Sequence, residues 1–199
     1  MNFDFFEKYK YKIKSKPELK KILQKSGPSK KSIMCHGVFD IVHPGHVRHL
    51  IHAKNRADIL IVSLTSDKFI SKGKFRPHVP EKIRSLNMSA FEMVDYVIID
   101  DEKTPINLIK FLKPKFFAKG FEYTASEINN NTLVEEKTVR SYGGRMVFTP
   151  GDIIYSSSNL LNFHSPKIEG EKLFSLMHDN KITNNQLKNT LKKFKKFKI

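Results

Sequence analysis

Residues 36–46 read His36-Gly37-Val38-Phe39-Asp40-Ile41-Val42-His43-Pro44-Gly45-His46, a pattern typical of the connection between a strand and a helix. It follows a short apolar run at residues 32–36, which predicts a buried strand. Pro44 suits the first turn of a helix, so the stretch joins a strand to a helix N-terminus. Free backbone N–H groups and the positive end of the helix dipole favour an anion there. The stretch therefore predicts a phosphate site, at which His43 and His46 can face one spot and stabilise developing charge.

The alternation of strand and helix continues along the chain. Short, almost continuously apolar runs predict parallel strands covered on both faces, at residues 32–36, 58–64, 95–99, 115–118 and 145–148. Helical patterns occupy the intervals, at residues 44–56, 80–92, 105–112 and 132–142. This order predicts an α/β protein with a Rossmann-like, doubly wound parallel sheet in an α/β/α sandwich. Ligands of such sheets bind beyond the carboxyl ends of the strands.

Length and composition limit the class of protein. The chain has 199 residues, with 36 Lys and Arg against 20 Asp and Glu, for a formal charge of +16. A chain of this length usually forms one domain. No apolar run approaches the roughly 18 residues of a transmembrane helix. The single cysteine, Cys35, cannot form an internal disulfide, which fits a reducing compartment. We therefore expect a cytoplasmic protein.

The positive charge is concentrated at the two ends. Residues 1–31 hold ten Lys against three acids, and residues 181–199 hold seven Lys and no acid. We expect a basic amino-terminal extension with a short helix at 1–31, a main domain at 32–165 and a basic helical extension at 166–199. The extension at 166–199 carries an apolar stripe that comprises Leu187, Leu191, Phe194 and Phe197. Three interpretations of this stripe compete: docking on protein, binding to an anionic membrane surface and binding to nucleic acid. Without a recognised nucleic-acid-binding motif, no nucleic-acid partner is expected.

Several segments resemble one family. His43-Pro44-Gly45-His46 after Gly37-Val38-Phe39-Asp40 resembles the HxGH signature of the cytidylyltransferase-like nucleotidyltransferase superfamily, over about residues 30–163. Lys72-Gly73-Lys74-Phe75-Arg76-Pro77 resembles the KGxxRP loop of its heptose-phosphate adenylyltransferase branch, and Arg84 matches that branch's helix arginine. Lys119-Gly120-Phe121-Glu122-Tyr123 resembles the branch's KGxDY segment, with Glu122 replacing the usual Asp. Tyr155-Ser156-Ser157-Ser158-Asn159-Leu160-Leu161 resembles the superfamily's terminal phosphate motif.

The resemblance implies a set of site residues. Those expected to act in catalysis are His43, His46, Lys72 and Arg84. Those expected to bind the nucleotide are Gly37, Val38, Phe39, Asp40, Gly45, Lys119, Gly120, Glu122, Ser156, Ser157 and Ser158. No protein-held metal is expected, because the histidines at 46, 49 and 52 lack a nearby Cys or paired carboxylate. Mg²⁺ would instead accompany the nucleoside triphosphate, held by its phosphate oxygens and water.

The resemblance also implies an activity, the transfer of a nucleotidyl group from a nucleoside triphosphate to a sugar phosphate with release of pyrophosphate. AMP is the favoured group, with ATP favoured over CTP as donor, and surface-polysaccharide synthesis is the expected setting. The nearest pattern is the domain that accompanies sugar kinases in bifunctional enzymes. A sugar kinase is therefore a candidate partner, and a homodimer is expected because the superfamily commonly forms dimers.

Other interpretations stay open at this point. In the alternative interpretation, none of these residues contacts a ligand. Lys72 then only solubilises a loop, Arg84 forms a surface salt bridge, and the serines at 156–158 cap a helix. Asp40 would either orient the histidine loop or contact the nucleotide. Two other functions compete with adenylyl transfer: a cytidylyltransferase for an alditol or lipid-precursor phosphate, and a non-catalytic basic module on the same nucleotide-binding fold.

Overall fold

The sheet has five parallel strands in the order β3-β2-β1-β4-β5. A computed structural model describes residues 5–70, 76–120 and 130–149. The strands are β1 (Ser32–Gly37), β2 (Ile59–Thr65), β3 (Tyr96–Asp100), β4 (Phe116–Gly120) and β5 (Arg145–Thr149). Each begins and ends within two residues of a predicted run, because these runs are apolar enough to be buried on both faces. The doubly wound parallel sheet is confirmed.

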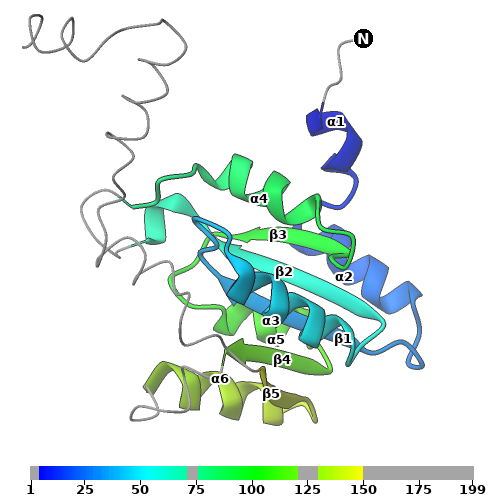
Figure 1. The fold of residues 1–199 in the computed structure, drawn as a ribbon. Helices are drawn as coiled ribbons and strands as arrows, with labels where there is room; N and C mark the ends of the chain where they lie inside the picture. Colours follow the sequence, from blue (N-terminus) through cyan, green and yellow to red (C-terminus); the bar gives the residue numbers. More distant parts are fainter. Residues whose placement is uncertain (1–4, 71–75, 121–129, 150–199) are drawn as a thin grey trace, which may run out of the picture. The chain divides into compact units, whose positions relative to one another are not determined.

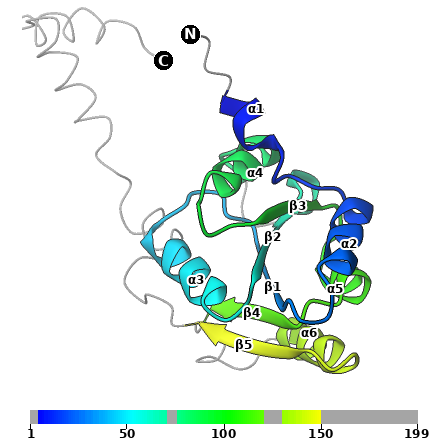
Figure 2. The ribbon, with the colours of Figure 1, turned by 90° about the vertical axis from the view of Figure 1, so that its right-hand side faces the viewer.

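Helices cover both faces of the sheet (Figures 1 and 2). On one face lie α3 (Pro44–Lys54) and α4 (Glu81–Ser89), and on the other lie α2 (Lys16–Lys25), α5 (Ile106–Leu112) and α6 (Asn130–Arg140). A short helix, α1 (Phe5–Lys10), and a 3₁₀ turn, η1 (Asp67–Phe69), complete the described elements. None of the described helices is long and apolar enough to cross a membrane.

The core has two halves, one on each face of the sheet. Leu50 of α3 and Met88 of α4 are fully buried against Ile33 and Val62 on the first face. On the second face, Leu108 and Ile109 of α5 pack with Ile61 and Phe117. Successive residues of β1 and β2 point to opposite faces, so a continuous apolar run supplies both halves. This burial fixes the strands whose carboxyl ends carry the site.

The amino-terminal segment packs onto the domain. Ser15 caps α2 and accepts from the backbone N–H of Glu18, whose carboxylate accepts from the Ser15 backbone N–H at 2.8 Å, as the capping box predicts. Leu19 is fully buried in the second half of the core. Ile13 forms a parallel bridge with Val97, so the segment before α2 covers the outer edge of β3. The amino-terminal segment, expected as an extension, therefore contributes to the core and to the sheet. Leu19 and Leu23 of α2 pack beside α5 on the second face of the sheet.

The strand order places one topological switch between β1 and β4. The chain runs outward from β1 through β2 to β3, then returns to add β4 and β5 on the other side. The helices that follow β1 and β4, α3 and α6, therefore lie on opposite faces of the sheet, and open α/β sheets bind ligands at the carboxyl ends of the strands at such a switch. The histidine stretch follows β1, and Lys119 and Gly120 end β4.

Candidate active site

The loop after β1 adopts an uncommon backbone conformation. Phe39 has a φ of 48°, in the left-handed region that costs energy for a residue with a side chain. Its ring is buried, with an exposed fraction of 6%. A Cβ added to Gly37 would lie only 3.1 Å from Cε2 of Phe39. Burial of the ring thus offsets the backbone strain, and the absence of a side chain at Gly37 lets the loop turn tightly over β1.

His43 and His46 share the N-terminus of α3. Their ring centroids lie 3.9 Å apart, and Phe39 packs against His46 with centroids 5.1 Å apart. His43 is the N-cap residue, and its Nδ1 accepts from the backbone N–H of Gly45 at 3.1 Å. Nδ1 of His46 accepts from the backbone N–H of His43 at 3.4 Å. The two imidazoles therefore take the places that Ser and Glu occupy in an ordinary capping box.

This capping arrangement assigns the proton on each ring. An Nδ1 atom that accepts from a backbone N–H carries a lone pair, so the proton of each neutral imidazole resides on Nε2. Both Nε2–H groups are then hydrogen-bond donors. The helix N-terminus adds the positive end of the α3 dipole beside them. Chemically, the loop can stabilise an anion on which negative charge increases during a reaction.

Asp40 ties the next segment to the histidine loop. Oδ1 accepts from the backbone N–H of Val79 at 2.9 Å, and Oδ2 accepts from Nε of Arg76 at 3.1 Å. Burial alone would raise the pKa of Asp40, but these bonds and one from the His78 backbone outweigh it and lower the pKa. Asp40 therefore orients these loops, and its contact with the nucleotide stays a prediction.

Arg84 lies beneath the loops rather than at the open edge. Its side chain is fully buried, and Nε donates to the Val79 carbonyl at 2.9 Å. Nη1 donates to the carbonyl of Val38, while Nη2 donates to the Thr65 carbonyl at 2.9 Å and to Asp67 at 2.6 Å. One guanidinium thus joins the loops after β1 and β2 to α4. A surface salt bridge does not describe it, and its contact with a phosphate stays a prediction.

Lys119 turns towards α6 at the end of β4. Its Nζ donates to the carboxylate of Glu135 and, at 3.2 Å, to the hydroxyl of Thr132. The exposed side-chain fractions of Lys119 and Glu135 are 14% and 7%. Burial raises the pKa of Glu135, and the nearby ammonium partly opposes that rise. The pair fixes the direction of the strand end that Gly120 completes.

The remaining predicted site residues are Lys72, Glu122, Ser156, Ser157 and Ser158, which lie outside the described residues, as does the apolar stripe of residues 187–197. The described loops do bring together Gly37, Val38, Phe39, Asp40, His43, Gly45 and His46. In the described part of the chain, no group of three or more His, Cys, Asp or Glu could hold a metal ion.

Sequence reasoning missed several polar residues that support the site. His49, one turn after His46, shares a hydrogen bond of 2.5 Å between its Nδ1 and the hydroxyl of Thr149. Thr149 in turn donates to the carbonyl of Lys119 at 3.2 Å. Burial, with a smaller contribution from His52, lowers the pKa of His49 to about 4. The spacing of 46, 49 and 52 places these histidines on one helix face, but no sequence signal indicates the contact with Thr149, which is 100 residues away.

Comparisons with known proteins identify a family and several relatives. The sequence profile of a family described as cytidylyltransferase-like matches residues 34–163. The bifunctional protein HldE of Campylobacter concisus is 39% identical over 138 residues, which cover 68% of this chain and 29% of the relative. The protein of the same name from Geobacter metallireducens is 38% identical over 138 residues, covering 68% of this chain and 27% of the relative. This chain therefore spans less than a third of these relatives.

Solved structures share the fold. A lipopolysaccharide core biosynthesis protein from Thermoplasma volcanium superposes with a TM-score of 0.51 at 24% identity, covering 62% of this chain and 98% of the other. Pantoate-beta-alanine ligase from Francisella tularensis, complexed with beta-gamma ATP and beta-alanine, gives a TM-score of 0.57 at 15% identity. That match covers 88% of this chain and 85% of the other. At these identities the likeness concerns the fold alone.

Proposed function

The chain belongs to the cytidylyltransferase-like family, and from this premise we propose that it transfers a nucleotidyl group from a nucleoside triphosphate to a sugar phosphate. AMP is the favoured group and a heptose phosphate the favoured acceptor, with surface-polysaccharide synthesis as the setting. Segments 72–77 and 119–123 support this choice by resembling the heptose-phosphate adenylyltransferase branch. The 39% identity to bifunctional protein HldE over 138 residues supports the same branch.

The observation that carries the proposal is the histidine pair at the start of α3. Two imidazoles with centroids 3.9 Å apart, both with Nδ1 engaged by backbone N–H groups, offer two Nε2–H donors at a helix N-terminus. As the bond to the bridging oxygen breaks, negative charge develops on the departing pyrophosphate beside the charged oxygens of the transferred group. Donors fixed in advance stabilise that charge without reorganisation, which is where catalysis of this reaction class gains most.

The reaction needs no protein nucleophile. An oxygen of the acceptor phosphate forms a bond to the α-phosphorus, the bond from that phosphorus to the bridging oxygen breaks, and pyrophosphate leaves. A phosphate monoester is already ionised near neutrality, so no general base is needed either. The protein's tasks are positioning and charge stabilisation, through His43, His46, Lys72 and Lys119, with Ser156–Ser158 on the phosphates. Arg84 and Asp40 act as positioning residues that hold the loops together.

Mg²⁺ fits this site as part of the substrate. In the described histidine loop, the hydrogen-bond donors are imidazole and backbone N–H groups, which bind phosphate oxygens. Mg²⁺ instead prefers oxygen ligands. We therefore propose that Mg²⁺ arrives with the triphosphate, held by phosphate oxygens and water, and neutralises part of its charge. We further propose action in the cytoplasm as a homodimer, with a sugar kinase activity, on this or another chain, supplying the acceptor phosphate.

Release of pyrophosphate tests the proposal. The full chain is incubated with ATP or CTP and a panel of heptose, hexose and alditol phosphates, and pyrophosphate is measured. We expect turnover with ATP and a heptose phosphate. His46→Ala should lower kcat by about 100-fold, the usual cost of losing one donor to a developing oxyanion. His43→Asn keeps an N-cap residue while removing the imidazole, so it should lower kcat similarly without unfolding α3.

His52→Gln is the matched control, because His52 lies on the same helix but contacts Arg56 rather than the loop. It should leave turnover within about twofold of the unaltered chain. Turnover that survives His46→Ala would remove the histidine pair from the mechanism. Turnover with CTP and an alditol phosphate alone would assign the other branch of the family.

A further inference from the structure

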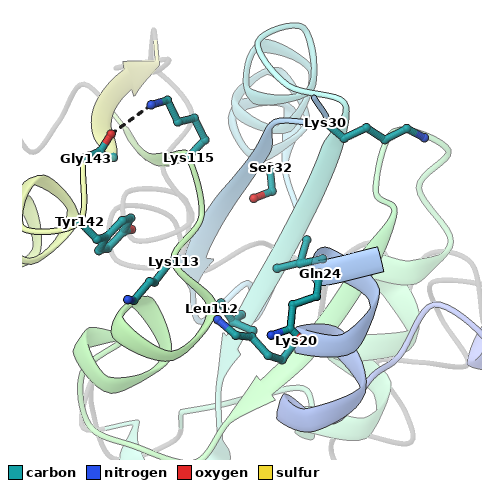
Figure 3. Close-up of a pocket in the computed structure, with 11 residues that line it drawn as sticks. Lys20, Gln24, Lys30, Ser32, Leu112, Lys113, Lys115, Tyr142 and Gly143 are labelled. Carbon is teal, nitrogen blue, oxygen red and sulfur yellow. Dashed lines mark hydrogen bonds between the residues drawn. The ribbon is translucent and has the colours of Figure 1, made fainter. Parts of the chain in front are cut away.

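A cavity lies at the amino ends of the strands, opposite the histidine loop. It has a volume of about 300 Å³ and opens where β1, β4 and β5 begin, beside the ends of α2, α5 and α6 (Figure 3). Ser32, the first residue of β1, lies in its wall. The histidine loop follows the other end of β1, and a six-residue strand separates its ends by about 17 Å. The two sites are therefore distinct.

The cavity is strongly basic. Its wall contains four lysines, Lys20, Lys30, Lys113 and Lys115, and no acidic residue. Lys20 donates to the carbonyl of Phe111 at 2.6 Å, and Lys115 donates to the carbonyl of Gly143 at 3.1 Å. In the described part of the chain, Lys113 has no side-chain hydrogen bond or ion pair. Lys30 extends away from the other lysines in Figure 3 and belongs to the rim.

Helix ends alone do not account for this charge. Three helices end here, and each C-terminus carries about half a negative charge, which lysines commonly neutralise. Lys20 neutralises one of these ends by binding the carbonyl of Phe111 in the last turn of α5, whereas Lys115 binds the carbonyl of Gly143 in the turn beyond α6. Each of those bonds uses one of three N–H groups, so both lysines keep donors for a ligand. With Lys113, the cavity holds more positive charge than its helix ends require.

The rest of the wall combines apolar side chains with the polar residues Gln24 and Ser32. Leu23 and Leu112 line it together with the ring of Tyr142. The Tyr142 hydroxyl donates to the carbonyl of Pro114 at 3.1 Å, and burial raises the pKa of that hydroxyl, so it stays a neutral donor. A planar aromatic surface beside several ammonium groups suits a ligand with a ring at one end and phosphate oxygens at the other. The volume is at the lower end for small-ligand pockets, which suits one nucleotide.

We propose that this cavity is a second binding site, which takes a nucleoside phosphate with its phosphates on Lys20, Lys113 and Lys115 and its base against Tyr142. The site is separate from the proposed active site and does not depend on the proposed function. The chain would then bind phosphorylated ligands at two places, one at the carboxyl ends of the strands and one at their amino ends.

Calorimetric titration of the full chain with ADP tests the proposal. We expect two equivalents bound to the unaltered chain and one to the double variant Lys113→Asn/Lys115→Gln. Asn suits position 113, because Lys113 has a φ of 51° and Asn tolerates the left-handed region. Lys110→Gln/Lys137→Gln is the control, since it removes the same charge from exposed positions of α5 and α6 outside the cavity wall. It should still bind two equivalents.

The outcomes separate the two sites. His46→Ala should weaken the other equivalent and leave the cavity equivalent unchanged. If only the cavity equivalent is present, the second site stands and the proposed function fails. If the lysine variants bind as the control does, the second site is overturned. Pyrophosphate is a further arm: it should bind the cavity at least tenfold more weakly than ADP, and equal affinity would overturn the role of the base and Tyr142.

Discussion

Arg84 is a buried cation at the centre of the loops that carry the site. Its guanidinium bonds three backbone carbonyls and one carboxylate, from segments that follow two different strands. Arginine suits this task because its planar group offers five donors in a fixed geometry. A single side chain therefore sets the distance between the histidine loop and the turn after β2.

Removing this guanidinium should be costly. Arg84→Met fills a similar volume but leaves several buried carbonyls unpaired, so we expect the free energy of unfolding to fall by about 3–5 kcal/mol. Urea unfolding measures the change. Arg140→Met is the control, because Arg140 forms a surface pair with Glu136 and should cost less than about 0.5 kcal/mol. Equal effects of the two substitutions would contradict the positioning role of Arg84.

His49 makes stability depend on pH. Its pKa is lowered to about 4 in the folded chain, against about 6.5 when unfolded. Below pH 6.5 the unfolded chain binds a proton that the folded chain does not, so stability is present above that pH and lost as pH falls towards 4. Between pH 7 and pH 5 the loss from this residue should be about 2 kcal/mol. Urea unfolding of His49→Gln at both pH values should show a smaller loss by about that amount, and an unchanged loss would refute the assignment.

Individual site residues differ in how far their roles could be predicted from the sequence. The motif from Gly37 to His46 was predictable because its residues are neighbours in the chain and carry a distinctive pattern. The burial of Arg84 was not, since its partners at Val38, Thr65 and Asp67 are brought near only by the fold. The same holds for Glu135, which lies 16 residues from Lys119 and bears no local mark of the pairing.

At the scale of elements, α6 supports the end of β4 through this pair. The partly buried Lys119 donates to Glu135 and Thr132, which are both buried on the inner face of α6. Glu135→Gln keeps the shape and an acceptor but removes the counter-charge of a buried ammonium. We expect the free energy of unfolding to fall by about 2 kcal/mol and KM for the triphosphate to rise more than kcat falls.

Glu136→Gln provides the comparison for that variant, because Glu136 is the next residue of α6 and pairs only with the exposed Arg140 in the described contacts. It should change neither stability nor KM measurably. Steady-state kinetics and urea unfolding check both variants. A Glu135→Gln protein with unchanged KM would confine the pair to a purely structural role.

The elements themselves were predictable to within a few residues. Helices predicted at 44–56, 80–92, 105–112 and 132–142 are observed as α3, α4, α5 and α6. The ends differ most where turns are decided by tertiary contacts, as at α4, which ends at Ser89 rather than residue 92. The strand order could not come from sequence patterns, because all five runs are similarly apolar and their register depends on packing.

At the scale of the whole molecule, the amino-terminal segment protects an edge of the sheet. The backbone N–H of Lys14 donates to the carbonyl of Val97 at 2.8 Å, and the N–H of Val97 donates to the carbonyl of Lys12 at 2.9 Å. These bonds occupy groups on β3 that would otherwise be free to pair with another chain. Leu19 also closes the core beneath α2.

Deleting residues 1–31 should therefore cause aggregation at micromolar concentration, with a lower melting temperature, whereas deleting residues 1–11 should not. Light scattering and thermal unfolding measure both. The longer deletion also removes positive charge, so Lys14→Pro serves as a second variant: it removes one edge N–H and a single charge. It should lower the melting temperature, and unchanged behaviour of both altered chains would show that the edge needs no cover.

Because the amino-terminal segment covers β3, the folded unit begins earlier in the chain than the family match does. The family is recognised from residue 34 onward, yet the chain folds as a unit that also includes residues 12–33. A catalytic module cut at its recognisable border would carry its chemistry without its protection. Transferring this domain to another protein, by engineering or by gene fusion, therefore requires including the amino-terminal segment that covers β3. The alternative is to supply another protein segment that covers β3 instead.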